Sequence, residues 1–259
     1  MATSDRLGDV GPERSKAPLA RRTRGRLFFV SIAVLMLVVV VLGFGKSFFL
    51  RPVFIDKPLP VYLIVHGVTM SAWFVLFLVQ TTLVSVKRTD LHRKLGLLGL
   101  ALAAGVVVTA VVLNLNLVPR ALAAGAISRP EDGAAFALGS LSSLIPFVLL
   151  MGVAILKRGK PQIHKRLMFW AFVWMLGPAF TNTRPLGRVL DPLVAPYLPF
   201  FPADFVWLFA LVAYDWFTLR RVHPATYVPF IMLLLFFVFV TPWISENETL
   251  QQWLLTLSN

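Results

Sequence analysis

The chain contains no cysteine among its 259 residues. This absence excludes disulfide bonds, thiolate metal sites, iron–sulfur clusters and a cysteine nucleophile. Charged residues are also scarce: they make up 14% of the chain, whereas 58% is hydrophobic and the mean hydropathy is +0.77. A soluble domain of this length needs far more polar surface. The composition therefore predicts that a lipid bilayer surrounds most of the chain.

The basic excess is nevertheless large, with a net charge of +13 at pH 7. Such an excess can indicate nucleic-acid binding. In this chain the basic residues lie in short segments between apolar runs, and no basic module rich in aromatic residues is present. We therefore expect no nucleic-acid partner. The lipid bilayer is the expected partner, and a second membrane protein is kept as an alternative.

Seven apolar segments approach the roughly 20 residues that a helix needs to cross the hydrocarbon layer. They predict an all-α, seven-helix transmembrane bundle over residues 27–245, between a disordered basic arm (1–26) and an extracytoplasmic tail (246–259). The first apolar run lacks a signal-peptide cleavage site, so we expect an uncleaved anchor. The predicted spans are residues 27–44, 61–86, 95–118, 135–156, 167–183, 201–219 and 227–245.

The distribution of basic residues predicts the orientation of these spans. Of the 25 Lys and Arg residues, 18 lie in the N-terminal arm and in the connections 87–94, 157–166 and 220–221, and seven lie in the opposite connections. Cytoplasmic connections of membrane proteins are enriched in Lys and Arg. We therefore predict a cytoplasmic N-terminus and an extracytoplasmic C-terminus.

Two of the basic connections resemble each other. One reads VKR…LHRKL over residues 86–95, and the other reads LKR…IHKRL over residues 156–167. Each joins an inward-running helix to an outward-running one, so spans two to five predict two related hairpins. The repeat predicts that His92 and His164 lie at equal depth and face each other.

A group of polar residues near the cytoplasmic side is the candidate functional centre. Intramembrane polar groups are costly and usually face the interior of a bundle. Imidazole nitrogens and carboxylates are metal ligands at physiological pH, although helix anchoring and a structural ion pair explain the same residues. We expect Arg220 and Arg221 to neutralise the carboxylate that precedes them. The candidate metal ligands are His92, His164, Asp215 and His223.

The second span carries a polar stripe, formed by His66, Trp73 and Gln80 at intervals of seven residues. Seven residues are nearly two helical turns, so the three side chains share one face. Such residues are most simply explained as hydrogen-bonding groups between helices. A further set of outer polar residues comprises Asn114, Asn116 and Arg184.

Three blocks of the chain resemble a family of bacterial multi-pass inner-membrane proteins. The first joins the polar stripe to LHRKLG at 91–96, the second is HKRLM at 164–168 with GPA at 177–179, and the third joins YD at 214–215 to RVHPAT at 221–226. The resemblance implies a bacterial inner-membrane location and a multi-pass fold. It implies no catalytic residue, because no reaction is established for the family.

Several functions are compatible with these residues. The sequence has no nucleophile–base pair, phosphate-binding loop or standard metal-ligand spacing, which favours a non-enzymatic accessory, assembly or sensor protein. An alternative is a b-type haem protein in which His92 and His164 ligate the iron. In that alternative the haem propionates would be neutralised by Arg93, Lys94, Lys165 and Arg166.

Two further alternatives use other combinations of the same groups. A zinc-dependent membrane hydrolase would use the three inner histidines and Asp215, since three ligands leave an open position for an activated water. A transporter would use His66, Gln80 and Asp215 as a proton relay. The cofactor therefore stays open between none, haem b and zinc.

Overall fold

The computed structural model describes residues 19–182 and 202–258, and the regular secondary structure in these ranges is entirely helical. The first helix, α1 (Leu19–Phe44), continues through a π-helical turn, η1 (Gly45–Phe49), to the short α2 (Arg51–Phe54). Helix α1 begins within the segment predicted to be disordered, so only residues 1–18 of that arm lie outside the described ranges.

The two predicted hairpins are both present. Helices α3 (Val61–Ser85) and α4 (Thr89–Leu115) form the first, and α7 (Leu144–Leu156) and α8 (Pro161–Trp174) form the second. Between them lie α5 (Leu117–Ala123) and α6 (Pro130–Ser142). The remaining elements are α9 (Gly177–Asn182), α11 (Pro202–Leu219), α12 (Pro224–Leu235), the π-helical turn η2 (Phe236–Val240), α13 (Thr241–Ser245) and α14 (Glu248–Ser258).

Proline marks where several of these helices start. Helices α6, α8, α11 and α12 each have proline as their first residue. Proline is favoured at this position because its ring fixes a helical φ angle and its missing N–H would have had no partner inside the helix. Each of these prolines therefore marks the residue at which a connection ends and the next helix begins.

Five helical segments in the described ranges are long and apolar enough to cross a membrane, which supports a multi-pass membrane protein. They correspond to the first four predicted spans and to the seventh. The fifth predicted span is divided into α8 and α9, since the helix breaks just before Gly177 and Pro178. The sixth corresponds to α11, whose described apolar segment, Phe205–Leu219, is shorter than the other five.

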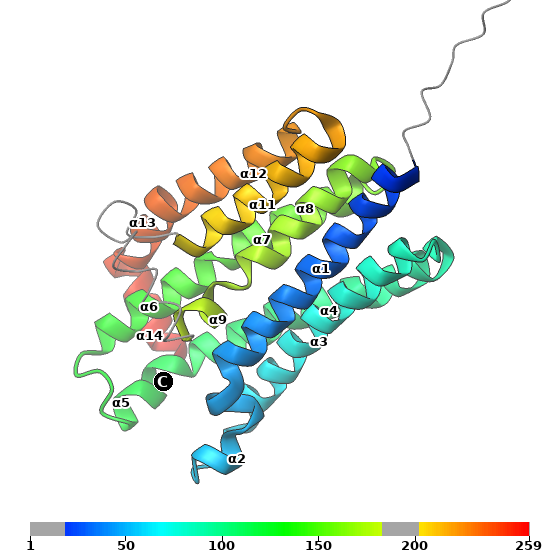
Figure 1. The fold of residues 1–259 in the computed structure, drawn as a ribbon. Coiled ribbons are helices and arrows are strands. Elements are labelled where there is room, and N and C mark those ends of the chain that lie inside the picture. Colours follow the sequence, from blue (N-terminus) through cyan, green and yellow to red (C-terminus); the bar gives the residue numbers. More distant parts are fainter. Residues whose placement is uncertain (1–18, 183–201, 259) are drawn as a thin grey trace, which may run out of the picture.

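The basic connections gather at one end of the bundle. Figure 1 shows the start of α1 at the same end as the turns that join α3 to α4, α7 to α8, and α11 to α12. Together with the first two turns of α4 and α8, these described segments contain 15 of the 25 Lys and Arg residues. The alternation of basic and less basic connections along the sequence therefore corresponds to two physical ends of the molecule.

The interior of the bundle is built from large aromatic side chains. Trp73 stacks on Phe172 with ring centroids 4.4 Å apart, and Phe77 stacks on the same ring at 4.0 Å. Aliphatic side chains, in contrast, cover the outer surface; Leu97 is 76% exposed and Leu156 is 81% exposed. An apolar exterior of this extent is stable only against lipid or another protein.

Helix α1 approaches α9 closely at a glycine. A Cβ atom added at Gly43 would lie 2.9 Å from the Ala179 Cα and would also meet the Ala179 carbonyl oxygen. Because the obstructing atoms are backbone atoms, a side chain at this position can be accommodated only if the two helices separate. Gly45, two residues later, has no atom within 4 Å of the same position.

We predict that Gly43→Ala lowers the free energy of unfolding by about 1–3 kcal/mol, the usual cost of overpacking. The matched control is Gly45→Ala, which adds the same methyl group into open space and should leave stability unchanged. Unfolding in mixed detergent micelles measures both variants. Equal stability of the two variants would contradict the close approach of α1 and α9.

Candidate functional site

The first turns of α8 direct three consecutive polar side chains toward different neighbours. His164 contacts α7 and lies beside His92 of α4, Lys165 contacts α1 and α11, and Arg166 contacts α11 and α12. Successive residues of an α-helix point about 100° apart, which explains the three directions. The start of α8 is therefore where the polar groups of the bundle converge.

Arg166 and Asp215 form a buried ion pair. Both side chains have 0% exposed surface. The Arg166 Nε donates to Asp215 Oδ1 at 3.1 Å, and its Nη2 donates to the same carboxylate oxygen. Nη1 of the guanidinium donates to the Gln162 backbone oxygen at 2.6 Å and to the Gln162 Oε1 at 2.9 Å. A buried pair of charges is stable when its remaining hydrogen bonds are satisfied in this way.

Two donors from the start of α12 complete the coordination of the carboxylate. The Thr226 hydroxyl donates to Asp215 Oδ2 at 2.5 Å, and the backbone N–H of His223 donates to the same oxygen at 2.8 Å. Thr226 also accepts a bond from Arg166 Nε, and its backbone oxygen accepts one from Trp170 Nε1. The cluster thus joins α8, α11 and α12.

The predicted partners of Asp215 were wrong. In the described part of the chain its ion-pair partner is Arg166, whereas Arg220 and Arg221 are exposed. The two arginines follow the end of α11, where the chain has already turned toward α12. Because Arg166 is paired with Asp215, it is also unavailable to neutralise a haem propionate, which is the role that the haem hypothesis gave it.

Lys165 has a separate environment made largely of aromatic rings. Its ammonium lies 4.8 Å from the centre of the Tyr214 ring and 5.4 Å from that of Phe29, and it donates to the Tyr214 hydroxyl at 2.6 Å. Ammonium groups are attracted to the faces of aromatic rings. This contact ties α8 to α1 and α11 without using a carboxylate.

His92 and His164 are brought together, as the repeat predicted. Each is the fourth residue of its helix, and the ring centroids are 6.4 Å apart with the ring planes nearly perpendicular. Both side chains are half-buried. A metal ion lies about 2 Å from each ligating nitrogen, so two imidazoles on opposite sides of one ion have ring centres about 6 Å apart.

The Nδ1 atom of each ring already has a hydrogen-bond partner. His164 Nδ1 lies 2.8 Å from the Ala154 carbonyl oxygen of α7. His92 Nδ1 lies 2.6 Å from the side-chain amide of Gln80 on α3, once this amide is oriented so that both of its ends make hydrogen bonds. Neither Nε2 atom has a side-chain hydrogen-bond partner in the described ranges, and the backbone of Gln80 is also close to the His92 ring. His164 has the arrangement common among ligating histidines, in which one nitrogen donates to a neighbour and the other is left for the metal. His92 Nδ1 instead accepts from Gln80.

The four predicted metal ligands do not form one cluster. Within residues 19–182 and 202–258 there is no group of three or more His, Asp or Glu residues that could hold a metal ion. Asp215 is occupied by Arg166. His223 caps α12, where its Nδ1 accepts a bond from Ala225 N at 3.0 Å, and burial lowers its pKa from the usual value.

The outer polar residues make local hydrogen bonds. His66 Nδ1 lies 3.1 Å from the Thr109 hydroxyl. The side-chain amides of Asn114 and Asn116 donate to backbone oxygens one turn earlier in their own region of the chain, at 2.8 Å each. The Trp73 indole N–H and the Asn114 Oδ1 are buried without a partner in the described residues. Arg184 lies outside those residues.

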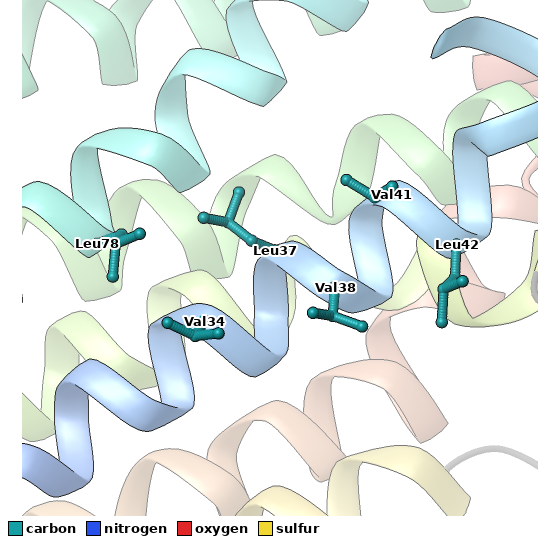
Figure 2. Close-up of a pocket in the computed structure, with 6 residues that line it drawn as sticks. All are labelled: Val34, Leu37, Val38, Val41, Leu42 and Leu78. Carbon is teal, nitrogen blue, oxygen red and sulfur yellow. The ribbon is translucent and has the colours of Figure 1, made fainter. Parts of the chain in front are cut away.

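A groove on the outer side of α1 carries no chemistry. It has a volume of about 270 Å³ and is lined only by valine and leucine side chains, five from α1 and Leu78 from α3 (Figure 2). No polar atom is available there to orient a ligand. The groove therefore belongs to the apolar outer surface, and the histidine pair is the better candidate site.

Sequence analysis missed Thr226, and it named Lys165 and Arg166 only as groups that would neutralise haem propionates, not as partners of Tyr214 and Asp215. The two basic residues were counted as cytoplasmic loop charges, although they lie inside the first two turns of α8. One signal was present in the sequence: an aspartate within an apolar helix needs a cation, and Arg166 lies at the apolar edge of its block. Pairing across 49 residues is, however, not visible from local spacing.

We predict that Asp215→Ala lowers the free energy of unfolding by about 3–5 kcal/mol, because it leaves the Arg166 charge buried without a partner. Asp90→Ala is the matched control: Asp90 pairs with Arg88 at 3.3 Å on an exposed surface, where water screens the pair and stability should be nearly unchanged. Unfolding of both variants in mixed micelles tests the difference. A similar loss in the two variants would show that burial of the Asp215 pair has no energetic consequence.

Comparisons with known proteins add no homologue to this description. No protein-family model, no curated protein and no solved structure matches the chain. The resemblance of the three sequence blocks to a bacterial membrane family therefore stays a prediction. Function has to be argued from the geometry of the site.

Proposed function

We propose that this chain is a non-enzymatic haem-binding protein of a bacterial inner membrane, in which His92 and His164 are the two axial ligands of one haem b. In this proposal the chain crosses the membrane seven times with its N-terminus in the cytoplasm, and α8–α9 and α11 are the two shorter spans. Its role is that of an accessory or sensor protein. The bound haem would supply a reversible iron redox centre or a gas-binding iron.

The observation that carries the proposal is the 6.4 Å separation of the two ring centroids. This is the spacing of two imidazoles that share one metal ion, given ligand bonds of about 2 Å. Both Nδ1 atoms are held by neighbours, and neither Nε2 atom has a side-chain hydrogen-bond partner among the described residues. The two histidines are thus positioned from opposite hairpins before any ligand binds.

The charge of the surroundings favours haem over a bare divalent metal. Arg93 and Lys94 follow His92 directly and are exposed, whereas Lys165 points away from His164 toward Tyr214. In the described residues no carboxylate joins the two histidines to form a three-ligand site. A dication would therefore add to the positive charge, whereas the two propionates of a haem would offset it. This argument also disfavours the zinc hydrolase, because its carboxylate ligand is committed to Arg166.

The test is the absorption spectrum of the protein purified from cells supplied with haem precursors. We predict a Soret band typical of two nitrogen ligands, and we predict that His92→Ala and His164→Ala each reduce it to background. His66→Ala is the matched control, since His66 bonds Thr109 at the other end of the same hairpin and should leave the spectrum unchanged.

Two results would contradict the proposal. One is a folded, monodisperse wild-type protein without a Soret band. The other is a band that persists in His92→Ala and His164→Ala, which would place the haem elsewhere.

A further inference from the structure

The hydrogen bonds around the histidine pair determine which nitrogen of His164 carries its proton. The partner of His164 Nδ1 is the Ala154 carbonyl, which can only accept. Ala154 is in the last turn of α7, where carbonyl groups have no partner within the helix. The neighbouring backbone donors Lys157 N and Arg158 N bond Val153 O and Ile155 O, so they leave this carbonyl to the histidine. His164 therefore has its proton on Nδ1 and a lone pair on Nε2.

The hydrogen bonds around His92 place its ring proton on the other nitrogen, Nε2. With its NH2 directed toward His92, the Gln80 amide donates to His92 Nδ1 at 2.6 Å and to the His92 backbone oxygen at 3.2 Å. Its oxygen then accepts from Gly96 N at 3.3 Å. Because His92 Nδ1 accepts a hydrogen bond, the proton of the neutral ring is on Nε2.

The two rings thus present unlike Nε2 atoms. His92 has an N–H at this position, and His164 has a lone pair. Such a pair is complementary for sharing one proton, but it cannot ligate one metal ion, because a ligating nitrogen needs its lone pair. Ligation requires the His92 proton to move to Nδ1.

We propose that Gln80 is a positioning residue that selects between these two states by the orientation of its amide. When its NH2 faces His92, the pair is in the proton-sharing state. When the amide rotates by half a turn, its oxygen accepts from His92 Nδ1–H, and both Nε2 atoms have free lone pairs. The rotated amide then directs its oxygen at the His92 backbone oxygen and its NH2 at Gly96 N, so this state forms only when a bound metal offsets the two lost hydrogen bonds. The ligand class selected by the second state is a metal centre that takes two neutral imidazoles, and this part of the inference rests on the proposed haem function.

Only one of the two histidines has an adjustable partner. The partner of His164 is a backbone carbonyl of a helix, which cannot rotate. Gln80 carries a donor and an acceptor at the end of a flexible side chain, so it serves either tautomer of His92. Gln80 is the innermost residue of the seven-residue polar stripe of α3, and both ends of its amide bond α4.

The tautomers can be measured directly by nitrogen NMR of the full-length, ligand-free protein, labelled at histidine and held at a pH where the imidazoles are neutral. The chain has four histidines, which single substitutions assign. His66 and His223 serve as internal references. The Thr109 hydroxyl donates to Gly105 O, so it accepts from His66 Nδ1–H, whereas His223 Nδ1 accepts from Ala225 N and leaves the proton on Nε2.

We expect the wild-type His92 to match the His223 reference and His164 to match the His66 reference. Gln80→Glu offers His92 only acceptor oxygens and should convert His92 to the Nδ1–H form, with the other three rings unchanged. Gln252→Glu, on the exposed side of α14, adds the same charge and should change none of them. Gln80→Leu, which removes both hydrogen-bonding functions, should give a mixture of His92 tautomers and provides a second test if the glutamate variant does not fold.

The inference is overturned if wild-type His92 is already in the Nδ1–H form, or if its tautomer is the same in wild type, Gln80→Glu and Gln80→Leu. The measurement contains no haem, so its outcome is independent of the absorption spectrum. If the protein shows the expected tautomers but no Soret band, the proposed role of Gln80 is supported and the proposed haem function is contradicted.

Discussion

Burial of the Arg166 guanidinium against the Asp215 carboxylate constrains three helices at once. Neither side chain has exposed surface, so neither can exchange its partner for water. Separating them would leave a charge in an apolar interior, at a cost of about 3–5 kcal/mol. Thr226 and the backbone of His223 add donors from α12 to the same carboxylate. The relative positions of α8, α11 and α12 are therefore fixed at the end of the bundle where the basic connections gather.

The same ion pair determines the direction of the histidine two residues earlier. Once Arg166 faces α11 and α12, the helical rotation of about 100° per residue turns Lys165 toward α1 and His164 toward α7 and α4. His164 then lies beside His92, which the first hairpin supplies from an equivalent position. The placement of the histidine pair between two hairpins thus depends on a charge pair that lies on another face of α8.

Much of this arrangement could be predicted from the sequence, because its signals are local. The apolar runs predicted the positions of the helices. The similarity of residues 86–95 and 156–167 predicted the two hairpins and the proximity of His92 and His164. The partner of Asp215 could not be predicted in this way. Arg220 and Arg221 are nearer in sequence, but α11 ends before them, whereas Arg166 is 49 residues away and buried. The predicted zinc site is unsupported because it required Asp215 as a free carboxylate ligand, and Asp215 is paired with Arg166.

The central claim is that the Arg166–Asp215 pair holds His164 beside His92. Because the native chain has no cysteine, the direct measurement is cross-linking of a His92→Cys/His164→Cys variant in native membranes by a short bismaleimide. A protease site introduced into the connection between α5 and α6 would report linkage as an uncleaved band on a gel. The account predicts efficient linkage that is largely lost when Asp215→Ala is added. Linkage that is absent in both proteins, or equal in both, would contradict it.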